Sequence, residues 1–409
     1  MRAFGVLLAS LLTAGVPAAI CGWGKDVNAG DGNKLIQSVR ADLAALVKAP
    51  ASERTKRAHE VARARADAIE AIKRFRNPEL VELERALLED SDWHVQHRAL
   101  LMAEALGDEG ALPLAWQRLG HAEPRLREKA AIACLLLWDK SAAKGVAGGK
   151  AKEALETLLA QETDFHVKQA LAALARRISG KLVPRRLVDE HVVALDDGLK
   201  LVPFLEGMDH LAEVAPGVTL QPKGSPGGSS AEKLPVAARW NAPLLGYGKE
   251  EVPGVALQPF GNPRSNGTVV HTGQDVGACL DGAGLYACAD GVVRFVHNGS
   301  DMGTLLVVEH HLSKKELVNA VYMHGGPVVF VEVGDKVAAG QLLGTMGVGF
   351  SIENGGHFAH LHLGLYPGPF SQTHNYGYKS AKDGVADWLD PAVALPKWIQ
   401  GDAGGAVGK

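Results

Sequence analysis

The sequence predicts a multidomain protein, with an all-α helical-repeat module at the N-terminus and a mainly antiparallel β domain after it. From residue 33 to residue 180, apolar residues recur at helical spacing, as in Leu35, Val39 and Leu43. Residues 221–233 are rich in Gly, Ser and Pro, which is the composition of a linker. Beyond them, short Val-rich runs alternate with glycine turns, a pattern typical of strands in a compact β domain. A chain of 409 residues is long enough for both parts.

Residues 1–19 have the pattern of a secretory signal peptide. Arg2 supplies the positive charge, an apolar stretch follows, and small residues around Ala18 offer a cleavage site. The alternative is a buried N-terminal helix. Cys21 could carry a lipid anchor, although Ile20 is bulky where lipoprotein signals prefer a small residue. The signal predicts an exported protein, periplasmic or extracellular, and no later stretch is apolar enough for a membrane span. The formal net charge of -3 gives no support for a nucleic-acid partner.

A short motif recurs in the helical region. It occurs as Asp92-Trp-His-Val95, Glu123-Pro-Arg-Leu126 and Asp164-Phe-His-Val167, with an apolar residue four positions after each, at Ala99, Ala130 and Leu171. The intervals are 31 and 41 residues, and a Gly-rich insertion at 144–150 accounts for the longer one. Paired helices at this period resemble HEAT-type repeats, which stack into a solenoid. The alternative is an irregular helical bundle. The resemblance gives a helical-repeat domain at 33–180, with a surface that could bind a protein partner.

Residues 181–234 combine an uncertain segment with the linker, and the β domain is assigned to 235–400. In the uncertain segment, 191–195 and 199–205 could be two strands around a turn. The strands expected in the β domain are 267–270, 291–297, 304–310, 318–323, 342–346 and 360–365. The composition of the linker and the change of periodicity predict that the β domain folds independently of the helices.

The cysteines predict one disulfide. Cys279 and Cys288 flank a short Gly-rich stretch and are the natural pair in an exported protein. Closing so short a loop would stabilise the fold by roughly 2–3 kcal/mol if the bridge is unstrained. The alternative is two free, buried thiols. Cys134 lies in an apolar helical run, which favours a core position.

Residues 271–362 carry the candidate site. Two histidines and one carboxylate complete a catalytic zinc site with one open position, and further histidines can transfer protons. On a strand, His271 and Asp275 would be roughly 13 Å apart, which is too far for one ion. Because the intervening residues also form a poor helix, Gly273 predicts a tight bend, with both ligands on a strand-end turn.

The other candidates are His324, His360 and His362. Residues two apart on a strand point to the same face, so the last two should face one cleft. Spacing alone does not say which of the two binds the metal. His297, His310, His311 and His374 are interpreted as structural or surface residues, and His357 is left outside the site.

Several motifs between residues 252 and 366 occur in the order of one enzyme family. They are Pro259-Phe-Gly261, His271-Thr-Gly-Gln-Asp275, Ala287-Cys-Ala-Asp-Gly-Val-Val293, Val321-Tyr-Met-His324, Val333-Gly-Asp-Lys-Val-Ala-Ala-Gly-Gln-Leu-Leu-Gly344 and His360-Leu-His362. In this order they resemble the lysostaphin-like (LytM-type) zinc endopeptidases. The chain departs from the family pattern where Leu363-Gly-Leu365 replaces an acidic residue and where Gly325-Gly-Pro327 follows the histidine.

The resemblance implies the roles of the site residues. His271, Asp275 and His362 would bind one Zn2+ per chain, and His324 and His360 would be catalytic. The implied activity is zinc-dependent cleavage of peptide bonds in bacterial cell-wall peptidoglycan. The bond cut, a D,D-crosslink or a glycine-containing bridge, stays open. The alternatives are a catalytically silent, wall-binding activator of other hydrolases and a periplasmic helical-repeat scaffold.

Overall fold

The computed structural model describes most of the helical region and most of the β domain. The described residues are 84–138 without 86 and 90–92, 146, 150–186, 236–247, 257–277, 281–299, 302–349, 354, 357, 359–370 and 377–401. The predicted signal peptide, Cys21, the two strands expected at 191–205, the linker, Cys279 and His374 lie outside them.

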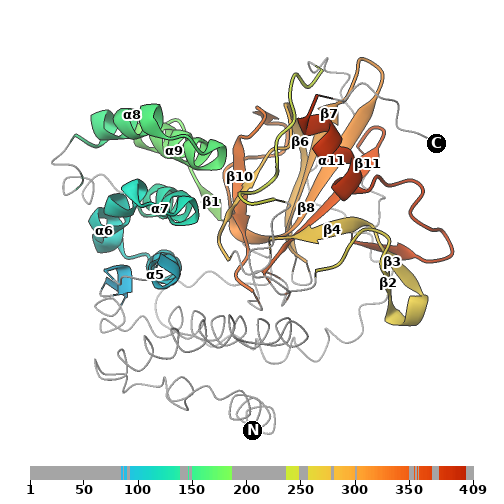
Figure 1. Ribbon diagram of the computed structural model, residues 1–409, viewed down its shortest axis with the longest axis horizontal. Helices are drawn as coiled ribbons and strands as arrows, with labels where there is room; N and C mark the ends of the chain where they lie inside the picture. Colours follow the sequence, from blue (N-terminus) through green and yellow to red (C-terminus); the bar gives the residue numbers. More distant parts are fainter. Residues whose placement is uncertain are drawn as a thin grey trace, which may run out of the picture.

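The described helices are stacked, with α7 between α5 and α9 (Figure 1). They are α5 (Trp93–Leu106), α6 (Leu112–Gln117), α7 (Pro124–Leu137), α8 (Ala151–Gln161) and α9 (Phe165–Ile178). The recurring motif of the sequence is the helix start. The Glu123 side chain accepts from the backbone N–H of Arg125, and the Asp164 side chain accepts from those of His166 and Val167. These caps supply acceptors to N–H groups that lack partners within the helix. The motif that recurs in the sequence therefore marks the first residues of α7 and α9.

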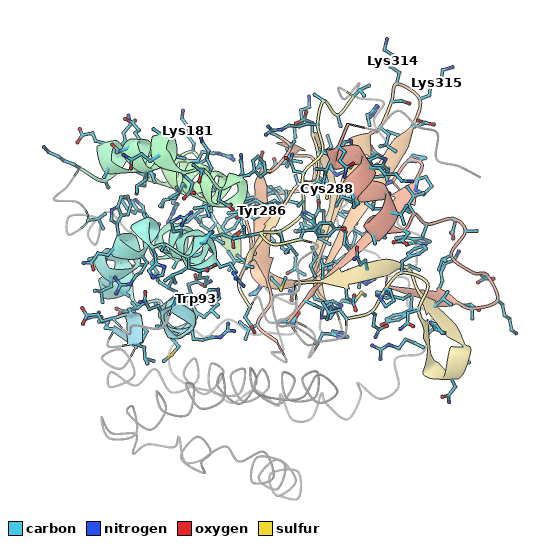
Figure 2. All side chains as sticks on the ribbon, in the orientation of Figure 1. Trp93, Lys181, Tyr286, Cys288, Lys314 and Lys315 are labelled. Carbon is cyan, nitrogen blue, oxygen red and sulfur yellow. The ribbon has the colours of Figure 1, made fainter. Side chains whose placement is uncertain are left out.

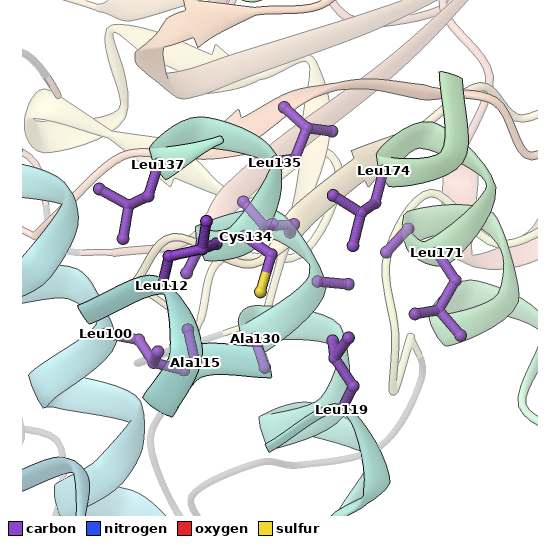
Figure 3. Packing of buried hydrophobic residues seen from close by; sticks show 14 of the residues in the cluster. Leu100, Leu112, Ala115, Leu119, Ala130, Cys134, Leu135, Leu137, Leu171 and Leu174 are labelled. Atoms are coloured by element: carbon purple, nitrogen blue, oxygen red, sulfur yellow. The ribbon is translucent and has the colours of Figure 1, made fainter. Parts of the chain in front are cut away.

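The apolar partners of the motif form the helical core. Leu126, Ala130 and Leu171 are fully or almost fully buried, and Cys134 lies among them (Figure 3). Burial raises the pKa of the Cys134 thiol, which confirms the predicted core position. Helices α5–α9 together form the helical module.

The β domain is a sheet of antiparallel pairs, as predicted. Within the described residues the sheet has nine strands, with the main order β4-β11-β8-β7-β6-β9, and a second sheet has the order β12-β3-β2. The strands are β1 (Arg185–Arg186), β2 (Pro263–Arg264), β3 (Val269–His271), β4 (Gly273–Val276), β5 (Gly284–Tyr286), β6 (Gly291–Gly299), β7 (Gly303–His311), β8 (Leu317–Val329), β9 (Lys336–Val337), β10 (Leu342–Met346), β11 (Leu361–Pro367) and β12 (Tyr378–Ser380). A C-terminal helix, α11 (Pro391–Ile399), adds Leu395 and Trp398 to the core. The expected strands are confirmed, most with small shifts of their ends, but β8 continues six residues beyond the expected end at 323. The short strands and α11 were not predicted.

Alternation along the central strands separates two apolar clusters. Leu361, Leu363 and Leu365 of β11 face the larger cluster, so His362 faces the opposite side. That side also carries Val321 of β8, in a smaller cluster with several aromatic rings. The strand pattern therefore fixes the face of the sheet on which the candidate site lies.

The helical module shares its core with the β domain. Tyr286, Phe330 and Leu342 belong to the same buried cluster as the helices, and Tyr286 lies between the two parts (Figure 2). The hydroxyl of Tyr286 donates to Glu128 Oε1 of α7 at 2.6 Å, and His166 Nε2 lies 3.0 Å from the carbonyl oxygen of Ala242. The interface thus combines apolar packing with hydrogen bonds, and independent folding of the β domain stays a prediction.

We expect the two parts to stay associated when the covalent linker is cut. A full-length chain with a protease site inside 221–233 should co-elute as one species after cleavage, since separation would expose Tyr286, Phe330 and Leu342. Exposing such a side chain costs about 1.5–3 kcal/mol. Size-exclusion chromatography of cut and uncut protein measures this. Two separately eluting, soluble pieces would instead support independent folding.

Glu128 should make stability depend on pH. Burial raises the pKa of this carboxyl to about 7, although the hydrogen bond from Tyr286 opposes the shift. The folded state then binds more protons than the unfolded state between about pH 4.5 and 7, so stability is greatest below this window and falls as pH rises through it. The full loss is on the order of 3 kcal/mol. Glu128→Gln keeps an acceptor for Tyr286 and should abolish this component.

Thermal unfolding from pH 4.5 to 7.5 tests the pH prediction. The difference in stability between Glu128→Gln and the parent chain should grow with pH, while the exposed Glu156→Gln on α8 should follow the parent. Parallel curves for Glu128→Gln and the parent would contradict the assignment.

The predicted disulfide is wrong in this structure. Cys288 is a free, buried thiol, and the hydroxyl of Tyr322 lies 3.1 Å from its sulfur. Burial raises the pKa of the thiol to about 12. Cys288 therefore contributes packing in the larger β cluster. Among the helices that the structure describes, none has the length and apolar character needed to cross a membrane.

Candidate metal centre

His271 and Asp275 lie on two consecutive short strands. His271 ends β3 and pairs with Tyr378 of β12, whereas Asp275 lies in β4 and pairs with His362 of β11. The chain changes from one sheet to the other at Thr272. The expected strand-end turn is therefore a switch between sheets, and it brings His271 Nε2 to 3.2 Å from Asp275 Oδ1.

Gly273 acts by its lack of a side chain. A Cβ at this position would lie 2.5 Å from the carbonyl oxygen of Leu363 and 2.6 Å from His362 Nε2. Its φ angle is not in the left-handed region, so the bend inferred from the sequence is not the reason for glycine here. The reason is the close approach of β11 and of the His362 ring.

Three side chains converge on one point. His271 Nε2 lies 2.8 Å from His362 Nδ1, and Asp275 Oδ1 lies 3.4 Å from the same Nδ1. One ligand atom from each of the three lies within 4.8 Å of the other two. In the described part of the chain, Asp275 Oδ1 is buried and accepts no hydrogen bond. Two imidazoles and a carboxylate are a donor set that suits zinc.

Hydrogen bonds fix the tautomer of His271. Its Nδ1 lies 3.0 Å from the carbonyl oxygen of Pro259. A carbonyl oxygen only accepts, so Nδ1 carries the proton and Nε2 directs its lone pair at the convergence point. A metal-binding histidine usually has its second nitrogen held in this way.

The protonation states also suit a cation. Burial alone would raise the pKa of Asp275, but the positive charge of His360 and contacts with His271 and His362 hold it well below its usual value. Burial lowers the pKa of His362, against the opposing effect of Asp275. A carboxylate and neutral imidazoles are the forms that bind metal ions.

His324 and His360 stand beside the convergence point. The two rings have centroids 4.5 Å apart, and His360 Nε2 is 3.5 Å from Asp275 Oδ1. His324 adopts φ 63, a left-handed conformation that is rare outside glycine. Its Nδ1 lies 3.1 Å from the carbonyl oxygen of Met302, so Nε2 carries the lone pair. Burial, followed by the charges of neighbouring histidines, lowers the pKa of His324 well below its usual value.

His357 also belongs to this group, although the sequence interpretation left it out. Its ring centroid lies 4.2 Å from that of His324, and Asn354 Nδ2 donates to its carbonyl oxygen at 2.7 Å. Its position shortly before His360 is the only signal in the sequence. His310 is structural, as predicted. It is fully buried on β7 with Nδ1 3.0 Å from the carbonyl oxygen of Asp290, and burial lowers its pKa to about 4.

Comparison with known families supports both halves of this description. Residues 269–373 match the model of peptidase family M23, a span that contains all the site histidines and Asp275. This part of the β domain is therefore similar to M23 peptidases. Residues 50–135 match the model of HEAT repeats, so α8 and α9 continue the helical module beyond the matched span. A search of curated proteins finds no match to the chain. The M23 domain confirms the predicted resemblance and supports peptidase activity.

Proposed function

We propose that this chain is an exported zinc metalloendopeptidase that hydrolyses peptide bonds of bacterial peptidoglycan. The observation that carries the proposal is the convergence of His271 Nε2, Asp275 Oδ1 and His362 Nδ1 inside the M23 domain. His271, Asp275 and His362 would hold one Zn2+, because His362 Nδ1 lies 2.8 Å from His271 Nε2 and one ligand atom of each of the three lies within 4.8 Å of the other two. Export rests on the signal pattern of residues 1–19.

His324 and His360 would have separate roles in proton transfer. Bound zinc would lower the pKa of water from 15.7 towards about 7 and polarise the scissile carbonyl. His324 accepts the water proton, because its Nε2 lone pair is free and its low pKa keeps the ring neutral. His360 donates to the developing oxyanion, since its Nε2 lies beside the convergence point, 3.5 Å from Asp275 Oδ1. The strained backbone of His324 holds the ring in place for this role.

Zymography on purified cell wall tests the proposal. Full-length protein should clear the wall, chelator should abolish clearing, and Zn2+ should restore it. Binding to the wall without clearing would instead support the silent activator. Absence of both binding and clearing would favour the helical-repeat scaffold, with the helical module as the surface for a protein partner.

A further inference from the structure

We propose that the helical module positions the catalytic histidines through an ion pair between Arg98 of α5 and Asp281 of the β domain. This inference rests on the proposed peptidase function. Arg98 Nη1 lies 3.4 Å from Asp281 Oδ2, and the two side chains are 15% and 2% exposed. The pair joins the two parts of the chain at a point six residues after Asp275, where no catalytic group is located.

Asp281 is hydrogen-bonded to a residue that follows β10. Its Oδ1 accepts from the N–H of Gly349 at 2.9 Å. Next to it, the N–H of Gly282 donates to the carbonyl oxygen of Met346, and the N–H of Met346 donates to that of Ala283. Residues 281–283 therefore hold the end of β10 and the first residues after it.

Residues 347–349 contact the surroundings of all three non-ligand histidines. The N–H of Gly347 donates to the carbonyl oxygen of His324 at 2.9 Å. A Cβ on Gly347 would lie 2.8 Å from Asn354, whose amide holds the His357 carbonyl, and a Cβ on Gly349 would lie 2.8 Å from the backbone nitrogen of Ala359. Residue 347 is thus bonded to His324, and residue 349 packs against the backbone next to His360, so a shift of this segment is expected to displace these histidines.

A second helix of the module, α7, also contacts residues 281–283. Lys129 Nζ of α7 bonds Glu104 Oε2 at 2.7 Å and reaches the carbonyl oxygen of Gly282 at 3.4 Å. Because Gly282 has no side chain, Leu101 and Lys129 can approach it closely. Removing one charge from a buried pair leaves the other uncompensated, which is strongly destabilising locally. Loss of Arg98 should therefore disturb Asp281 and, through it, Gly349.

The chain offers a matched control pair. Arg127 Nε lies 2.7 Å from Glu162 Oε2, with side chains 15% and 6% exposed. This pair is as buried as Arg98–Asp281, but both of its residues belong to the helical module. A purely structural role would make Arg98→Gln and Arg127→Gln behave alike.

The test uses full-length Arg98→Gln, Arg98→Lys, Asp281→Asn, Arg98→Gln/Asp281→Asn and Arg127→Gln. Turnover of a wall peptide, zinc content, thermal stability and hydrogen exchange of 344–362 would be measured. We expect Arg98→Gln to lower kcat on the order of tenfold with KM and zinc unchanged, since small misplacements of reacting groups are costly. Arg98→Lys should recover most of kcat, and the double variant should be no worse than either single one. Arg127→Gln should lose stability without losing kcat.

The results of this test distinguish a failure of the inference from a failure of the proposed function. Unchanged kcat in Arg98→Gln would overturn it, as would equal losses of kcat in Arg98→Gln and Arg127→Gln. If the parent chain has no peptidase activity, the proposed function fails. Hydrogen exchange then tests whether the Arg98–Asp281 pair holds the histidines in place. Faster exchange of 344–362 in Arg98→Gln but not in Arg127→Gln would support positioning, and equal exchange would overturn it.

Discussion

Replacing His271, Asp275 or His362 by alanine is expected to lower zinc occupancy, because each change removes one of the three proposed metal ligands. Replacing His324 or His360 by alanine should leave zinc in place and lower turnover on the order of 10²–10⁴, the range for one positioned proton-transfer group. Metal content by mass spectrometry and turnover of a wall peptide would be measured for all five variants.

A control variant shows whether the losses in the ligand variants and in the proton-transfer variants come from a folding defect. His310→Gln, on the far side of the sheet from the site, provides a control for a buried histidine without a proposed role. Loss of zinc in His360→Ala with retention in His362→Ala would reverse the ligand assignment. Normal turnover in both His324→Ala and His360→Ala would refute the proposed proton transfers.

Gly273→Ala is expected to disable the metal centre with a single added methyl group. The new Cβ would lie 2.6 Å from His362 Nε2 and 2.5 Å from the Leu363 carbonyl oxygen. The Leu363 carbonyl belongs to the backbone of β11, so the added methyl group must displace either β11 or the His362 imidazole. Displacing a reacting group by about 1 Å can cost on the order of 10² in rate, and overpacking costs about 1–3 kcal/mol of stability.

The glycine prediction is checked by zinc affinity in chelator competition together with thermal unfolding. Gly120→Ala is the control, since a Cβ there would meet nothing within 4 Å. Weaker zinc binding in Gly273→Ala, beyond any change in Gly120→Ala, is the expected result. Full zinc affinity and activity in Gly273→Ala would mean that β11 can yield at this point.

The long strands and the site histidines could be predicted because their signals are local. Buried runs such as those of β7 and β8 show strand character in the sequence itself, and two-residue spacing places His360 and His362 together. The placement of His271 was less accurate, because β3 pairs with β12 more than a hundred residues later. A change of sheet at Thr272 depends on that distant partner and leaves no local pattern.

The packing of the helical module against the β domain could not be predicted either, and the reason is different. Glu128, Lys129 and Tyr286 are polar residues that usually lie at the surface, yet all three are buried at the interface. Their burial is tolerated because Tyr286 bonds Glu128 and Lys129 bonds Glu104. The bond between Tyr286 and Glu128 joins residues more than a hundred positions apart, and the linker composition pointed towards independence instead.

The bond between Glu128 and Tyr286 has a consequence for the history of the chain. The HEAT match and the M23 match are separate segments, so each half has relatives of its own. A substitution at either position that removes its polar group would leave the other one buried without this partner, whereas a change such as Glu128→Gln keeps the bond. Relatives that contain both segments should therefore keep a hydrogen-bonding pair at positions 128 and 286, and solitary M23 domains should be unconstrained at the position of Tyr286.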